Sequence, residues 1–254
     1  MSAGEFAARL RKRERILGYW CVLDSPVSTE WLAHVGWDYI ALDVQHGLIG
    51  YSGMVGGLTA IDASGSAVGL VRVEANDMTA IGRALDAGAA GVIVPMINNA
   101  DETAKAVAAA HYPPTGIRSY GPMRSQLRIG PRPADADRDT VVLAMIETAE
   151  GLADVEQICG VPGLDGVYVG PSDLRLAIGG AHSQDPAVDE QFESALKRVR
   201  EAAKAAGIAA AIHVADGASA ARRIAEGFTV ATVASDVVHL KQASAAHLKA
   251  ASGG

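Results

Sequence analysis

The sequence predicts a single-domain α/β protein of the (β/α)8 TIM-barrel class, spanning residues 1–254. Short apolar runs alternate with alanine-rich helical segments along the chain, which is typical of strands joined by helices in a parallel sheet. The runs are apolar throughout rather than at every second position, as expected for strands covered on both faces. Eight strands alternating with helices in 254 residues match the size of one barrel.

The elements follow from these runs in chain order. The expected strands are Ile16–Leu23, Tyr39–Leu42, Ala67–Val73, Gly91–Val94, Val141–Ile146, Gly166–Val169, Ala209–His213 and Thr229–Ala234. The expected helices are Ser28–His34, Tyr51–Ala63, Met78–Ala87, Ala100–Ala110, Gly151–Ile158, Val188–Ala206, Ala218–Glu226 and Asp236–Ala250. Gly88, Gly207 and Gly227 follow helix ends, where a left-handed backbone closes the last turn. A doubly wound open sheet is the alternative, but the sequence has neither a G-x-G-x-x-G after the first strand nor a G-x-x-x-x-G-K-[ST], so we expect no nucleotide cofactor.

Two segments fall outside this alternation. Met1 to Ile16 is amphipathic and basic, but Glu5 and Glu14 interrupt the positive charge, so we expect a capping helix rather than a mitochondrial presequence. The same segment lacks the apolar core and the small-residue cleavage site of a secretory signal. His111 to Asp139 is rich in proline and arginine, and we expect a long loop that forms a lid, a binding loop or an oligomer contact.

Composition narrows the classes of partner. The formal net charge is −7, and an acidic surface lacks the positive charge that nucleic-acid binding needs. No run approaches the roughly 20 apolar residues of a membrane span. Cys21 and Cys159 are too few for a disulfide framework, which is typical of a reducing compartment. We therefore expect a cytoplasmic protein without nucleic-acid or membrane partners.

Ionisable side chains stand at the ends of five expected strands, where the active sites of such barrels lie. They are Asp43 and His46 after the second strand, Arg72 on the third, Glu147 after the fifth, Asp173 after the sixth, and His213 at the end of the seventh. Each has a structural alternative, such as a helix cap, an ion pair or a hydrogen-bonded core histidine. Together they indicate function, because folding alone gives no reason for acid, base and cation to recur at one end of the barrel.

These residue types predict metal-assisted enolate chemistry. Glu147 and Asp173 are carboxylates from adjacent strands, and two carboxylates with waters and a chelating substrate describe a Mg²⁺ or Mn²⁺ site. His46 follows Asp43 closely enough for that carboxylate to orient its imidazole as a base. Arg72 supplies a positive charge where an enolate oxygen develops. No lysine ends a strand, so Schiff-base catalysis is not expected.

Several motifs in order resemble the HpcH/HpaI aldolase family. They are Leu42-Asp43-Val44-Gln45-His46-Gly47, Val71-Arg72-Val73, Leu85-Asp86-Ala87-Gly88-Ala89, Val94-Pro95-Met96, Tyr112-Pro113-Pro114-Thr115-Gly116-Ile117-Arg118 and Gly170-Pro171-Ser172-Asp173-Leu174. The resemblance runs from about Gly18 to Asp236. Each motif alone is weakly specific, whereas the ordered set is specific for the family.

The resemblance implies a class II pyruvate aldolase, which reversibly cleaves a 4-hydroxy-2-oxo acid to pyruvate and an aldehyde through a metal-bound pyruvate enolate. It implies that Glu147 and Asp173 bind the divalent metal, Mg²⁺ or Mn²⁺ with Co²⁺ as a further option. It also implies that His46, oriented by Asp43, serves as or activates the base, and that Arg72 stabilises the enolate. The substrate carboxylate would lie against the segment Gly170-Pro171-Ser172-Asp173, at a helix start.

The chain also departs from the family pattern. Gln45 stands where a known member of the family has Glu, Ser172 where Ala is frequent, and His213 where an apolar residue is usual in degradative members. These departures concern the acceptor more than the enolate chemistry. The expected acceptor-side residues are Trp20, Gln45, Arg118 and His213.

The resemblance further implies a homo-oligomer, commonly a hexamer built as a trimer of dimers that exchange the C-terminal helix. Val237, Val238, Leu240 and Leu248 give that helix an apolar stripe, although packing on its own barrel would explain it equally. Two other functions remain open. One is oxaloacetate decarboxylation or citrate-type condensation by the same enolate chemistry, and the other is a noncatalytic barrel that binds a carboxylate.

Overall fold

Eight parallel strands close into a barrel in the computed structural model, which describes residues 1–253. The strands are β1 (Ile16–Cys21), β2 (Tyr39–Asp43), β3 (Val68–Arg72), β4 (Gly91–Val94), β5 (Val141–Ile146), β6 (Gly166–Val169), β7 (Ala209–Val214) and β8 (Val230–Val233). Each strand pairs with its neighbours in chain order, and β8 pairs with β1 through Val230 and Ile16, so the barrel has no open edge. The predicted fold class is confirmed.

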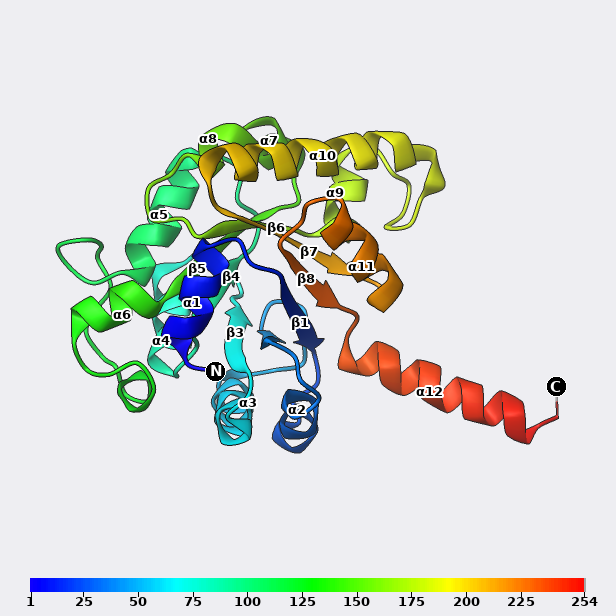
Figure 1. The fold of residues 1–254 in the computed structure, drawn as a ribbon, viewed down its shortest axis with the longest axis horizontal. Coiled ribbons are helices and arrows are strands. Elements are labelled where there is room, and N and C mark those ends of the chain that lie inside the picture. Colours follow the sequence, from blue (N-terminus) through cyan, green and yellow to red (C-terminus); the bar gives the residue numbers. More distant parts are fainter. Residues whose placement is uncertain (254) are drawn as a thin grey trace.

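Helices cover the outside of the barrel (Figure 1). They are α2 (Pro26–Ala33), α3 (Tyr51–Ser64), α4 (Met78–Asp86), α5 (Ala100–Ala110), α6 (Pro133–Asp139), α7 (Ala149–Ala153), α8 (Val155–Cys159), α9 (Pro171–Ala177), α10 (Asp189–Ala206) and α11 (Gly217–Ala225). Side-chain caps fix several helix starts, as at Asp77 and Asp216, and Gly207 closes α10 with a φ of 74°. Over residues 1–253, none of these helices combines the length and the apolarity needed to cross a membrane.

The barrel interior and the outer layer form separate apolar cores. Successive residues of a strand point to opposite faces, so every second residue points inward. The inner core contains Tyr39 and Ala41 of β2, and Leu143 and Met145 of β5. The outer core lies between the strands and the surrounding helices. Continuing the inward series by two residues places polar side chains at the C-terminal mouth of the barrel: Asp43, Arg72, Glu147 and His213.

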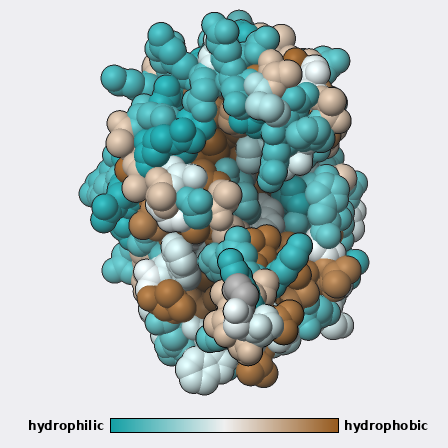
Figure 2. All heavy atoms as spheres, turned by 90° about the vertical axis from the view of Figure 1, so that its right-hand side faces the viewer, coloured by the Kyte–Doolittle hydropathy of each residue, from teal (hydrophilic) through white to brown (hydrophobic). Residues whose placement is uncertain are grey.

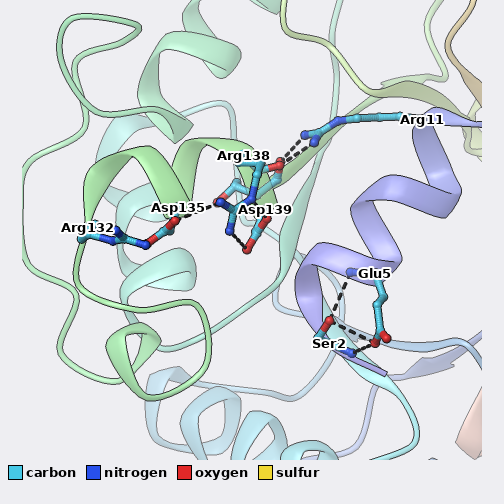
Figure 3. A network of polar contacts seen from close by, with 8 residues as sticks. Ser2, Glu5, Arg11, Arg132, Asp135, Arg138 and Asp139 are labelled. Atoms are coloured by element: carbon cyan, nitrogen blue, oxygen red, sulfur yellow. Dashed lines mark hydrogen bonds and ion pairs between the residues drawn. The ribbon is translucent and has the colours of Figure 1, made fainter.

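Helix α1 (Ala3–Arg11) closes the opposite end of the barrel, as the capping-helix prediction requires. Phe6 and Leu10 are fully buried in the inner core, and the Phe6 ring packs edge-on against Tyr39 with centroids 5.8 Å apart. Figure 3 shows the polar contacts that hold α1 and α6 in place, including a capping box between Ser2 and Glu5. The N-terminal end of the barrel is therefore filled and capped.

Two expectations about local structure are wrong. The helix expected over Gly151–Ile158 is two short helices, α7 and α8, because Asp154 adopts a non-helical backbone between them. The segment His111–Asp139 is not one long loop, since its last residues form α6, and a short 3₁₀ turn precedes it at Ser125–Leu127. Pro133 at the first helical position and the acidic Asp135 in the first turn favour that helix.

Helix α12 (Asp236–Ala251) leaves the barrel and projects away from it (Figure 1). Its base is fixed, because the Asp236 carboxylate accepts hydrogen bonds from the backbone N–H groups of Val22 and Leu23, each at 3.1 Å. Beyond the base the helix is exposed, including Leu240 and Leu248, whose exposed fractions are 60% and 71%. Figure 2 looks onto the side from which α12 projects and shows apolar side chains among polar ones on that face.

Candidate active site

A cavity of about 190 Å³ opens at the C-terminal ends of the strands. It brings together most of the predicted site residues: Trp20, His46, Arg72, Glu147, Gly170, Pro171, Ser172, Asp173 and His213. A larger cavity of about 320 Å³ lies beside Tyr51 and Arg83, but it contains none of these groups. The smaller cavity is therefore the candidate active site.

A buried ion pair joins β2 to β3 beneath this cavity. The Arg72 guanidinium donates two hydrogen bonds to the Asp43 carboxylate, with Nε at 2.9 Å from Oδ1. The Trp20 indole N–H donates to the other oxygen of Asp43 at 3.2 Å. Burial alone would raise the pKa of Asp43, but these contacts, above all with Arg72, hold it below its usual value. Arg72 therefore presents a fixed guanidinium to the cavity.

Asp43 also shapes the loop that carries His46, although not in the expected way. Asp43 Oδ1 accepts hydrogen bonds from the backbone N–H groups of His46 at 3.0 Å and Gln45 at 3.1 Å. Over residues 1–253, no hydrogen bond joins Asp43 to the His46 ring, so the expected direct orientation of the imidazole is not seen. Gly47 keeps the turn tight, because a Cβ there would lie 2.1 Å from the carbonyl oxygen of Asp43. The carboxylate positions the His46 backbone rather than its ring.

Glu147 carries a buried carboxylate oxygen without a protein partner. Its Oε1 accepts the backbone N–H of Met96 at 2.8 Å, whereas its Oε2 is buried and has no hydrogen-bond partner in residues 1–253. Burial raises the pKa of Glu147, and the nearby charge of Asp173 raises it further. Met96 has a positive φ of 56°, which is uncommon outside glycine and aims its N–H at the carboxylate.

Asp173 lies in the first turn of α9, beside the Glu147 carboxylate in the cavity lining. Within residues 1–253 it makes neither an ion pair nor a side-chain hydrogen bond. An unpartnered buried oxygen and a second carboxylate are what a hard divalent cation requires, so the residues present fit such an ion. Residues 1–253 contain no group of three His, Cys, Asp or Glu side chains that would hold a metal alone, so such an ion would need waters or substrate as further ligands.

Gly170 makes room for the Glu147 carboxylate. A Cβ on Gly170 would lie 2.3 Å from Glu147 Oε2 and 3.0 Å from the Met145 methyl carbon. No side chain larger than hydrogen fits there without displacing the carboxylate. Gly170 is therefore required because the Glu147 carboxylate lies so close to its Cα. Its φ of −90° is one that other residues also adopt.

Comparisons with known proteins bear on this site. The family model described as HpcH/HpaI aldolase/citrate lyase matches residues 16–243. The chain belongs to this family. It is 41% identical over 232 residues to a hydroxypyruvate/pyruvate aldolase of Rhizorhabdus wittichii, covering 90% of each chain. It is 34% identical to a 5-keto-4-deoxy-D-glucarate aldolase of Klebsiella pneumoniae, covering 92% of this chain and 91% of that protein.

A solved structure of an HpcH/HpaI family protein from Burkholderia cenocepacia superimposes with a TM-score of 0.88. The two chains are 32% identical, and the match covers 98% of this chain and 99% of that one. The predicted family and the predicted enzyme class, a lyase of the aldolase type, are confirmed.

Two cavity residues of this HpcH/HpaI family member were not among the predicted site residues. Met145 and Tyr168 line the cavity directly below Glu147 and Gly170, two residues earlier on β5 and β6. The period of two along each strand is the signal that identifies them, because it turns these side chains inward. Met96 is a third omission, since it acts through its backbone N–H and no side-chain pattern marks it.

Arg118 and Gln45 do not line the cavity, unlike the other expected acceptor-side residues. Arg118 is buried, donates to the Asp86 carboxylate at 2.6 Å and stacks on the Tyr112 ring. An arginine already paired within its own chain is not free to bind an acceptor there. Gln45 lies in the loop beside His46, and its side-chain oxygen is buried without a partner in residues 1–253.

Proposed function

We propose that this HpcH/HpaI family member is a divalent-metal-dependent pyruvate aldolase that reversibly cleaves a 4-hydroxy-2-oxo acid to pyruvate and an aldehyde. The observation that carries the proposal is the buried, unpartnered Oε2 of Glu147 beside the unpaired Asp173. Relatives named as pyruvate and keto-deoxy-sugar-acid aldolases support the choice of reaction.

Glu147 and Asp173 would hold the metal, with Mg²⁺ or Mn²⁺ favoured by their carboxylate oxygens. When bound, the ion supplies a Lewis acid that polarises the 2-oxo group of the substrate. Because burial raises the pKa of Glu147, a nearby cation compensates a charge that the apolar surroundings disfavour.

The chain's own residues supply the remaining steps. His46 would accept the proton from the substrate 4-hydroxyl in the cleavage direction, and from the pyruvate methyl in the reverse direction. Arg72, fixed by Asp43, would stabilise the negative oxygen of the enolate. The backbone N–H groups of Ser172 and Asp173, in the first turn of α9, would bind the substrate carboxylate.

Deuterium exchange into the pyruvate methyl group tests this proposal without knowledge of the aldehyde. Chelator-stripped protein should show no exchange by NMR, and added Mg²⁺ or Mn²⁺ should restore it. Asp173→Asn should abolish the exchange, whereas Asp189→Asn, which changes an exposed side chain of α10 that pairs with Arg175 of α9, should leave it unchanged. Absence of exchange with every divalent metal would contradict the aldolase proposal and would favour a decarboxylase or a binding protein.

We further propose a homo-oligomer, a hexamer built from dimers that exchange α12. An isolated helix of 16 residues is marginal in water, and α12 exposes Val237, Leu240 and Leu248 outside its own barrel. A second copy that covers this stripe explains both features. Light scattering should give a multiple of the 26.1 kDa chain, and Leu240→Glu with Leu248→Glu should lower the mass. A monomer at micromolar concentration would contradict the exchange.

A further inference from the structure

His213 stands at the end of β7 on the cavity wall opposite the mouth of β3 and is not used by the chemistry above. Its ring packs edge-on against the Trp20 indole, with centroids 5.3 Å apart and an interplanar angle of 89°. Across residues 1–253, no hydrogen bond involves its ring nitrogens, and neither nitrogen belongs to the buried, unpartnered atoms. The ring therefore packs at right angles to Trp20 and lines the cavity with both nitrogens unpartnered within the described part of the chain.

The other residues on this wall have no hydrogen-bond donor left for a ligand. The Trp20 indole N–H donates to Asp43, and the Tyr168 hydroxyl donates to Thr232 at 2.7 Å. Met145 contributes an apolar chain. A ligand atom that reaches the wall formed by Trp20, Tyr168 and Met145 therefore meets, in the imidazole of His213, a ring nitrogen donor and acceptor that no described protein group occupies.

The imidazole is neutral near pH 7. Burial and the positive charge of Arg72 lower the pKa of His213 to about 4, although Asp43 partly opposes this. A neutral imidazole offers one N–H donor and one acceptor nitrogen. That pair matches a hydroxyl group, which also both donates and accepts, and it does not match a carboxylate or phosphate, which prefers a cation.

We propose that His213 is a specificity residue that hydrogen-bonds a hydroxyl group next to a carbonyl of the substrate, so that the enzyme prefers hydroxylated substrates to their deoxy analogues. This inference rests on the proposed aldolase function and names its substrate class. The cavity holds only about 190 Å³, so the hydroxyl must lie close to the reacting carbons. Two sources share this chemistry: a 3-hydroxy-2-oxo acid as the nucleophile, or a 2-hydroxyaldehyde as the acceptor.

Three proteins test the inference: the wild type, His213→Phe, which keeps a ring but removes the polar atoms, and His213→Gln, which restores a donor and an acceptor. With Mn²⁺ present, kcat/KM is measured for glycolaldehyde against acetaldehyde, with pyruvate as the nucleophile. Binding of hydroxypyruvate against pyruvate is measured by calorimetry. The wild type should prefer the hydroxylated member of at least one pair, and His213→Phe should reduce that preference about tenfold or more.

His213→Gln should recover part of the preference, and the pair affected identifies whether the hydroxyl belongs to the acceptor or to the nucleophile. Deuterium exchange into pyruvate is measured for both variants, so that a change in the preference is separated from a general loss of enolate formation. Equal losses for hydroxylated and deoxy substrates, or a wild type without preference, would overturn the inference. A binding preference that depends on His213 in a protein without exchange would support the inference while contradicting the aldolase function.

Discussion

The two ends of the barrel each hold a buried carboxylate, and the two carboxylates differ in how they are partnered. At the N-terminal end, Arg11 donates to the Asp165 carboxylate at 2.7 Å, and the other oxygen of Asp165 accepts the Val142 N–H at 2.8 Å. At the C-terminal end, Glu147 keeps a buried oxygen without a protein partner, and the His213 ring has none in residues 1–253. A carboxylate whose two oxygens both have internal partners stabilises the fold, whereas one that keeps an unpartnered buried oxygen is available to a ligand.

Neighbouring charges act in opposite directions on the pKa values of the Asp165 and Glu147 carboxyl groups. Burial raises the pKa of both Asp165 and Glu147. Arg11 opposes that rise at Asp165, whereas Asp173 adds to it at Glu147. A like charge beside a buried carboxylate is unfavourable for the metal-free fold, and it is the arrangement that a bound cation relieves.

The largest effect is expected from removing the Glu147 carboxylate at the C-terminal end of the barrel. Glu147→Gln should lower kcat/KM by about a thousandfold or more, because it removes a proposed metal ligand. The metal-free variant should unfold at the same temperature as the wild type or higher, because a neutral amide replaces a disfavoured buried charge. Steady-state kinetics at saturating Mn²⁺ and calorimetry measure the two properties. A stable variant that retains activity would remove Glu147 from the site.

Gly170→Ala should act on the same carboxylate without changing any charge. The new methyl group would meet Glu147 Oε2 at 2.3 Å, so we expect about a hundredfold loss of kcat/KM from the displaced carboxylate. Gly82→Ala in α4 is the matched control, because a Cβ there meets nothing within 4 Å, and it should leave the kinetics unchanged. Equal kinetics for the two variants would contradict the close-approach argument.

Asp165→Ala should lower the stability and leave the activity nearly unchanged, since it removes the paired carboxylate at the N-terminal end of the barrel. It leaves the buried Val142 N–H without an acceptor and Arg11 without its carboxylate, so we expect a loss of about 2 kcal/mol in the free energy of unfolding. Urea unfolding measures this loss. The kcat/KM should change by less than about twofold, because the pair lies at the far end of the barrel. A large kinetic effect would mean that the two ends are coupled.

The smallest effect concerns acid stability. The pKa of His213 is lowered from 6.5 to about 4, so the unfolded chain binds a proton there before the native protein does. The free energy of unfolding is therefore at its full value above pH 6.5, where His213 is neutral in both states, and it decreases as the pH falls toward 4. Between pH 7 and 4.5, His213→Gln should lose about 1–2 kcal/mol less unfolding free energy than the wild type, a figure reduced because the ring faces the cavity. Parallel urea curves at both pH values would count against a neutral His213.

Part of the site was predictable from strand ends alone. Glu147, Asp173 and Arg72 follow apolar runs, and parallel strands in a barrel bring their C-terminal ends together. Met145 and Tyr168 could be predicted only by noting that side chains two residues before Glu147 and Gly170 point to the same side of the strand. Met96 was beyond such reasoning, because its contribution is a backbone N–H set by an unusual φ.

The sequence by itself determined the barrel and the ionisable side chains at its mouth, because apolar periodicity and residue type are local properties of the chain. Only the tertiary structure decided which groups are paired. Asp43 faces Arg72 through the register of β2 against β3, rather than the ring of His46 three positions along the chain. Arg118, in the segment that follows α5, is paired with Asp86 at the end of α4. Partners of buried charges depend on strand register and helix packing, which join residues distant in sequence.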